Sequence, residues 1–163
     1  SSQGPNVNAD SAPTWMITKF EFGRRGKYAP VNVYWYEGTA RPKDPEIAKN
    51  LPMNGSLFIG DKGQVACAHG QSPVFIGDGV AAPAPYLPES PGHHAQWIAA
   101  CKTGSATGSN FAYAGPFTEI VLLGNVAYRA GIPITYDPKS MRITNNDAAN
   151  SLLRKDYRPG WEI

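Results

Sequence analysis

The stretch "GPFTEIVLLGNVAYRAGIP", residues 115–133, decides the fold, because it predicts one helix with almost no polar face. Pro116 suits the first helical position, where its missing N–H is no loss and its fixed φ is already helical. Gly131 suits a left-handed cap after the last turn, and the proline two residues later stops the helix. The pattern therefore predicts a helix that begins near Pro116 and ends at Gly131.

Only a narrow stripe of polar side chains interrupts the apolar surface of this helix. At about 100° per residue, the stripe consists of Thr118, Asn125 and Arg129. A helix this apolar is covered on most sides by other elements. It is too short and too interrupted to span a membrane, and Gly124 lets a neighbouring element approach closely. We therefore expect a central helix that lies lengthwise on a sheet.

The length, the net charge and the distribution of apolar residues exclude several classes of function. For this length we expect one domain, residues 1–163, in which residues 1–13 form a loose or docked leader. The net charge is +2 and no basic run exceeds Arg24-Arg25, so nucleic acid is not an expected partner. No stretch qualifies as a membrane span or a signal peptide. The chain begins without Met, as a processed product or a fragment does, so its sequence does not choose between an exported or periplasmic and a cytoplasmic location in a bacterium.

The order of elements along the chain predicts the α+β class. Strand-forming residues recur in pairs joined by tight turns, and the 17 glycines and 15 prolines gather in rigid surface loops. The expected strands cover 14–22, 31–37, 56–60, 64–68, 73–78 and both arms of a hairpin in 132–146, and the expected helices cover 92–103, 116–130 and 147–155. Hairpins first and helices late predict an open-faced, mostly antiparallel sheet with two or three helices packed on one face.

A search for chemical motifs finds no self-contained catalytic, cofactor or metal site. The sequence has no G-x-G-x-x-G after a strand and no G-x-S-x-G, and the Gly-rich segment 104–110 lacks the ending of a phosphate-binding loop. The carboxylates are scattered over turns, without a pair suited to glycosidase chemistry. Cys67 and Cys101 match no metal or redox spacing, so two buried free thiols are expected in place of a disulfide.

The adjacent histidines His93 and His94 allow two interpretations. Neighbours on a helix point about 100° apart, and His69 is the only other histidine, so no zinc site is expected. In the structural interpretation, which the pattern favours, one histidine helps to cap the helix and the other packs or faces solvent. In the functional interpretation, a histidine provides a hydrogen-bonding or acid–base group at a pocket rim, at the helix N-terminus.

The aromatic residues also allow two interpretations. Aromatic faces cover sugar rings well, so an exposed set would form a carbohydrate-binding platform. Composition favours ordinary packing in a core or a subunit interface. The residues concerned are Tyr28, Tyr34, Trp35, Tyr36, Tyr86, Trp97 and Trp161.

Three long stretches resemble the C-terminal part of one enzyme family. They are "NGSLFIGDKGQV" (54–65), "GHHAQWIAACKTGSATGSNFAYAGPFTEIVLLGNVAYRAG" (92–131) and "ITNNDAANSLLRKDYRPGWEI" (143–163). Together they resemble the Gfo/Idh/MocA oxidoreductases, with the exported-type dehydrogenases of sugar-handling bacteria as the nearest group. The resemblance runs from about residue 12 to the end of the chain and rests on ordered stretches, not on a short signature.

The resemblance implies a fold and a function. Members of the family join a Rossmann domain, which binds NAD or NADP, to an α/β domain with an open-faced antiparallel sheet. The second domain shapes a sugar or polyol pocket, and its open sheet face makes the oligomer interface. The implied chemistry is hydride transfer between a sugar carbon and nicotinamide. An enzyme of the same family can also use a transient oxidation to cleave a glycosidic bond.

The chain departs from the family pattern where catalysis resides. It contains no Rossmann half, no Glu-Lys-Pro segment and no Gly-Asp-x-x-x-His stretch, so no catalytic residue can be carried over and no cofactor is expected on this chain alone. The resemblance implies a Rossmann domain in the same or a separate chain, and His93, His94, Asn110 and Tyr113 as substrate-binding candidates. The alternative is a stand-alone, non-catalytic carbohydrate-binding or assembly domain.

Overall fold

The computed structural model describes residues 1–8 and 10–162 and confirms the α+β class. Its strands form three small antiparallel sheets where one open-faced sheet was expected. The chain divides into two compact units, residues 1–40 with 106–163, and residues 41–105. That both units form a single domain stays a prediction. In the part of the chain that the structure describes, no helix combines the length and the apolar character needed to cross a membrane.

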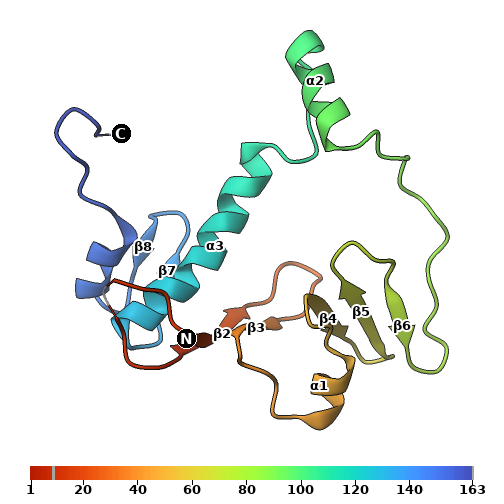
Figure 1. Ribbon diagram of the computed structural model, residues 1–163, viewed down its shortest axis with the longest axis horizontal. Helices are drawn as coiled ribbons and strands as arrows, with labels where there is room; N and C mark the ends of the chain where they lie inside the picture. The colour runs from red at the N-terminus through yellow and green to blue at the C-terminus, as the bar shows by residue number, and fades with distance from the viewer. Residues whose placement is uncertain (9, 163) are drawn as a thin grey trace. The chain divides into compact units, whose positions relative to one another are not determined.

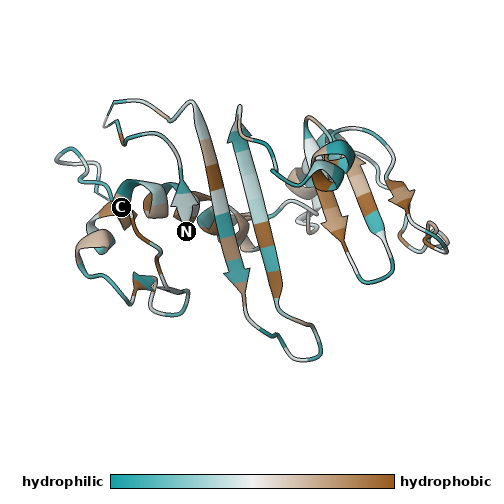
Figure 2. Ribbon diagram, turned by 90° about the horizontal axis from the view of Figure 1, so that it is seen from below, coloured by the Kyte–Doolittle hydropathy of each residue, from teal (hydrophilic) through white to brown (hydrophobic). Residues whose placement is uncertain are grey.

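The first unit contains a sheet of three strands, β1 (Ser2–Gln3), β2 (Trp15–Phe22) and β3 (Val31–Gly38), in that order. The hairpin of β2 and β3 was predicted from its β-branched and aromatic residues. Figure 2 shows hydrophobic and hydrophilic bands following one another along the two long strands at its centre, which are β2 and β3. Because side chains alternate between the faces of a strand, apolar residues occur on both faces of this sheet.

The predicted central helix, α3 (Phe111–Ala130), packs on β1 and β2 (Figure 1). Gly124 is the contact point: a Cβ added there would lie 3.1 Å from Thr18 Cγ2 and 3.3 Å from Phe20 Cζ. The Ser2 hydroxyl donates to the Gly124 carbonyl at 2.7 Å, and the Tyr128 hydroxyl donates to the Pro5 carbonyl at 2.8 Å. The first residues of the chain are therefore docked on α3, which is the second of the two alternatives expected for the leader.

The other side of α3 packs on a small layer formed by β7 (Tyr136–Asp137), β8 (Arg142–Ile143) and the 3₁₀ helix η1 (Ala148–Leu153). Val126 of α3 contributes to the core of this layer, and the partly buried apolar residues of the hairpin pack around it. Ile143 and Ala149 complete the core. The sequence predicts this hairpin and the short helix after it, although the helix is 3₁₀, not α.

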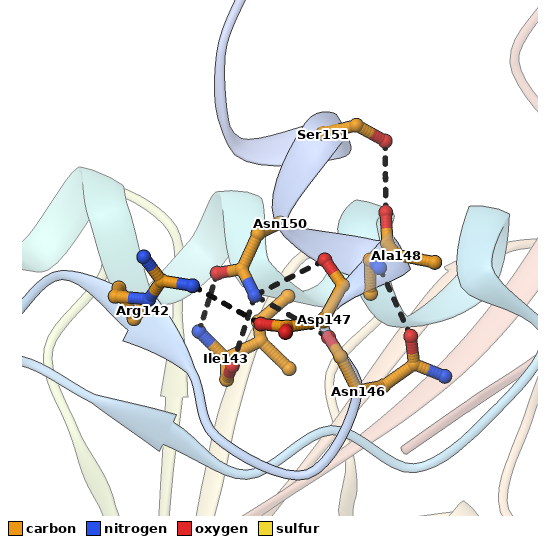
Figure 3. A network of polar contacts seen from close by, with 8 residues as sticks. Arg142, Ile143, Asn146, Asp147, Ala148, Asn150 and Ser151 are labelled. Carbon is orange, nitrogen blue, oxygen red and sulfur yellow. Dashed lines mark hydrogen bonds and ion pairs between the residues drawn. The ribbon is translucent and has the colours of Figure 1, made fainter.

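Asn150 joins β8 to η1 (Figure 3). Its Oδ1 accepts from the Ile143 N–H at 2.8 Å, and its Nδ2 donates to the Ile143 carbonyl at 3.0 Å. The same amide group reaches the carbonyls of Asn146 and Asp147, each at 3.3 Å. The Asn146 side chain accepts from the Ala149 N–H, whereas Asp147 forms an ion pair with Arg142.

Helix α3 starts earlier than the sequence analysis predicts. Its N-cap is Asn110, whose Oδ1 accepts from the Tyr113 N–H at 3.1 Å, and Pro116 lies inside the helix. Burial is confined to the C-terminal half, at Gly124 and at residues 126–128. The expectation of a helix covered on most sides is wrong for the first half.

The second unit begins with α1 (Pro45–Asn50), where Asp44 caps the N–H groups of Glu46 and Ile47. A three-stranded sheet follows, with β4 (Gly55–Ile59), β5 (Gln64–Ala68) and β6 (Val74–Ile76) in that order. The last element is α2 (His93–Thr103), which ends at a left-handed Gly104 as predicted.

Candidate functional site

The structure separates the four predicted site residues into two pairs. Asn110 and Tyr113 begin α3 in the first unit, and His93 and His94 begin α2 in the second unit. His93 and His94 lie at the start of a helix, as the sequence predicts. Asn110 and Tyr113 also lie at a helix start, because α3 begins five residues earlier than the predicted start at Pro116.

At the start of α3, the amide of Asn110 has structural duties. Its Nδ2 donates to the Thr107 carbonyl at 2.9 Å, while its Oδ1 caps the helix. The Tyr113 ring stacks on Phe117 with centroids 6.3 Å apart and planes 4° from parallel. Tyr113 is 66% exposed and Phe117 is 56% exposed. Two nearly parallel exposed rings offer a flat apolar surface with a phenol hydroxyl, which suits the apolar face of a sugar ring.

At the start of α2, both histidines are exposed. The helix begins after Gly92 without a side-chain cap, so the interpretation that His93 or His94 caps the helix is wrong. In residues 1–8 and 10–162, no group of three or more His, Cys, Asp or Glu side chains is arranged to hold a metal ion. The histidines are therefore available for hydrogen bonding from solvent, and whether they contact a substrate stays a prediction.

A groove that the sequence analysis missed lies on the side of α3 that faces away from β2. It has a volume of about 970 Å³ and is formed by the first unit alone. The polar stripe of α3, Thr118, Asn125 and Arg129, lies along it. That stripe was the available signal, because polar residues on an otherwise apolar helix mark the face that meets water or a ligand. The apolar lining includes Phe111, Leu122, Leu123, Met141, Leu152 and Leu153.

The ionisable groups of the groove are a tyrosine–glutamate pair and three cations. Burial raises the pKa of Tyr136 to about 12, and the Glu119 carboxylate, which accepts a hydrogen bond from its hydroxyl, adds to the shift. The Tyr136 hydroxyl is therefore a hydrogen-bond donor at neutral pH and not a nucleophile. Arg129, Arg154 and Lys155 line the same groove. This combination suits binding to a partly apolar surface with acidic groups.

The two cysteines are free, as predicted. Cys67 lies on β5 and is half-buried, whereas Cys101 on α2 is exposed. The expectation that both are buried is therefore wrong for Cys101.

Comparison of the chain with protein-family models, with characterised proteins and with solved structures found no match.

Proposed function

We propose that this chain is the substrate-binding and oligomerisation part of an NAD(P)-dependent sugar or polyol oxidoreductase, and that it is not catalytically complete by itself. The proposal starts from the resemblance of its long ordered stretches to the Gfo/Idh/MocA family. The observation that supports it best is the uncovered first half of α3. Phe111 is 92% exposed there, ahead of the exposed Tyr113 and Phe117.

A helix whose apolar N-terminal half is exposed to solvent is typical of a surface that binds another domain or another chain. Contiguous exposed apolar patches are unusual on a free monomer and mark interaction sites. The groove, which Phe111 also lines, adds Leu122 and Leu152 to the exposed apolar surface. Both surfaces suit coverage by a Rossmann domain, supplied by the same or a separate chain, which would hold the nicotinamide cofactor.

The sheet of the first unit supports an oligomer interface. Residues that oppose each other directly across an antiparallel pair lie on the same face of the sheet. Val33 and Trp35 of β3 therefore share a face with Phe20 and Thr18 of β2. Tyr34 lies on the other face. All three β3 side chains are exposed. A homo-oligomer formed through either face of this sheet would remove part of this exposed apolar surface from water.

The reaction proposed for the complete enzyme is hydride transfer. A sugar carbinol loses a hydride to the nicotinamide and a proton to a base, and becomes a ketone. In the first unit, this chain would bind the sugar through the ring face of Tyr113 and a hydrogen bond from Asn110, and it would contribute no catalytic base. The substrate contact expected of His93 and His94, which belong to the second unit, stays a separate prediction.

Titration calorimetry of the 163-residue chain tests the proposal. We expect no heat on addition of NADH, and measurable heat with one member of a panel of sugars and polyols. Tyr113→Ala should abolish the sugar signal, while Tyr86→Ala, which changes an exposed tyrosine of the other unit, should not. Micromolar affinity for NADH, or a complete absence of sugar binding, would contradict the proposal.

A second candidate function is a stand-alone carbohydrate-binding or assembly domain. The exposure of Trp35, Trp97 and Trp161 favours it, because this candidate requires aromatic side chains in solvent. A sugar signal that persists in Tyr113→Ala but disappears in Trp97→Ala would favour this candidate over the first.

A further inference from the structure

The groove on α3 follows one stripe of the helix over almost its whole length. Six of its lining residues follow one another along α3 at alternating intervals of four and three positions, so they share one helix face. In chain order, they are Phe111, Gly115, Thr118, Leu122, Asn125 and Arg129. At a rise of about 1.5 Å per residue, the stripe extends over about 27 Å.

The spacing and the openness of this stripe indicate a helical occupant. Alternating intervals of four and three residues form the seam along which two helices pack side by side. A Cβ added at Gly115 would meet nothing within 4 Å, so there is room beside the seam. Phe111, Leu122 and Met141 of the lining are exposed, whereas small-molecule sites enclose most of their ligand. A helix of another protein fits a long, open groove of this kind.

The apolar part of the lining would pack against the apolar face of such a helix. Leu122 and Leu152 come from the two sides of the groove, α3 and η1, and both are exposed. Met141, which is 61% exposed, adds a flexible side chain that can adapt to a partner. Contiguous exposed apolar surface marks an interaction site.

The charges of the groove define the polar part of the partner. In the part of the chain that the structure describes, no ion pair joins Arg129, Arg154 or Lys155 to a carboxylate. The carboxylate among the described lining residues, Glu119, accepts a hydrogen bond from Tyr136. The groove therefore has an excess of positive charge, which complements a partner that carries carboxylates.

The described helices of this chain do not have the chemistry that the groove requires. Helices α2 and η1 contain no acidic residue, and α1 is only six residues long. Helix α3 itself combines one carboxylate, Glu119, with one cation, Arg129. A second copy of the chain would therefore bring no helix whose charge complements the three cations.

We propose that the groove on α3 is the docking site for an acidic amphipathic helix of another polypeptide. This helix lies along α3 and places apolar residues, at intervals of three and four positions, on the exposed apolar lining. Its carboxylates pair with Arg129, Arg154 and Lys155. The inference concerns a protein partner and goes beyond sugar binding at Tyr113, which does not line the groove.

Two synthetic peptides of opposite charge test the site. Each has about 18 residues, which span the groove as a helix, with leucine at the seam positions and alanine and glutamine on the outer face. The residues that flank the seam are glutamate in one peptide and lysine in the other. Fluorescence anisotropy of the labelled peptides measures their affinity for the chain. We expect the glutamate peptide to bind at least about tenfold more tightly, and added salt to weaken its binding.

Charge reversal at the groove provides the matched variants. Arg154→Glu and Lys155→Glu should each weaken binding of the glutamate peptide by roughly tenfold and strengthen binding of the lysine peptide. The control is Arg24→Glu, which reverses an exposed cation of the same unit outside the groove. It should leave both affinities within about twofold, because salt screens distant charges.

The methionine methyl signals locate the bound peptide by NMR. Met141 lines the groove, so its signal should shift when the glutamate peptide is added. Met53 is exposed in the second unit and should not shift.

Equal affinities of the two peptides, no binding of the glutamate peptide, or a shift of Met53 without Met141 would overturn the docking site. None of these measurements involves a sugar or a cofactor. Failure of the docking site is thus distinguishable from failure of the proposed function, which the NADH and sugar titrations decide.

Discussion

At the residue scale, Gly124 is the position where α3 tolerates the least change. An added Cβ would lie 3.1 Å from Thr18 Cγ2, tighter than an ordinary contact, and Thr18 is buried on β2. Gly124→Leu should therefore lower the free energy of unfolding by about 1–3 kcal/mol through overpacking. Urea unfolding followed by circular dichroism measures this.

Gly115 of the same helix is the matched control for Gly124. A Cβ there would meet nothing within 4 Å. Gly115→Ala should raise stability by up to about 1 kcal/mol, because glycine is unfavourable inside a helix. Equal effects of the substitutions at the two glycines would show that α3 does not pack on β2 through Gly124.

Two variants of Asn110 distinguish its role as a helix cap from a role in binding sugar. Asn110→Ala removes the acceptor for the Tyr113 N–H and should lower stability by about 1 kcal/mol. Asn110→Ser should restore most of that stability, because serine is also a good N-cap. If Asn110 also binds a sugar through its amide, sugar affinity measured by calorimetry should fall in both variants. Unchanged affinity in Asn110→Ser would remove it from the site.

Tyr136 should give unfolding a pH dependence in the alkaline range. Its pKa in the folded state is raised to about 12 from an ordinary value of about 10, by burial and by Glu119. The neutral form is thus favoured by folding, and the stability contribution is complete below about pH 10 and is lost as pH rises toward about 12. Urea unfolding at about pH 8 and about pH 11 should show this decline. Tyr136→Phe should reduce the decline, whereas Tyr113→Phe, at an exposed position, should leave it intact.

At the element scale, local patterns predicted the hairpins and helix ends because neighbouring residues determine them. Alternating β-formers marked β2 and β3, and Gly104 and Gly131 ended α2 and α3 through their left-handed conformation. The start of α3 was missed because Pro116 is a strong start signal, yet it lies well inside the helix. The helix instead begins after Asn110, whose side chain accepts from the Tyr113 N–H and caps it.

The burial of α3 could not be predicted from its composition. The apolar residues of a helix indicate which of its faces can be buried, but they do not indicate which elements of the same chain bury them. The C-terminal half meets β1 and β2 on one side and η1 on the other, whereas Phe111 and Phe117 meet solvent. Sequence pattern therefore identified the helix and its apolar surface, but the division into a buried and an exposed half required the structure.

Asn150 is the residue on which the element pair β8 and η1 depends. Asn150→Ala removes the acceptor for the Ile143 N–H, and Ile143 is buried, so stability should fall by about 1–3 kcal/mol. Asn150→Asp keeps that acceptor but opposes the Ile143 carbonyl with a negative oxygen, so it should also destabilise. Ser151→Ala, which removes one exposed bond to Ala148, should change stability by less than about 0.5 kcal/mol. Thermal unfolding of the three variants tests whether both substitutions of Asn150 destabilise the protein more than Ser151→Ala does.

At the scale of the whole molecule, the candidate site was predicted in parts. His93 and His94 were placed correctly at the start of a helix because start signals are local, whereas Asn110 and Tyr113 were expected just before a helix that in fact begins at Phe111. The groove with Glu119 and Tyr136 was missed because these two residues belong to different elements and share no spacing rule. Long-range pairs of this kind become visible only when the chain is folded.

The exposed residues of β3 predict self-association of the chain. Val33, Tyr34 and Trp35 are exposed on a strand without Pro or Lys, which is a surface that associates unless it is covered. Sedimentation velocity should therefore show an apparent mass that rises with concentration. Val33→Lys places a charge on the face of β3 that also carries Trp35 and should weaken association by roughly tenfold, about 1.4 kcal/mol. Ile98→Lys adds the same charge at an exposed position of α2 and should leave association unchanged. If both variants associate as the original chain does, the β3 surface is not the interface; if Ile98→Lys alone weakens association, α2 is.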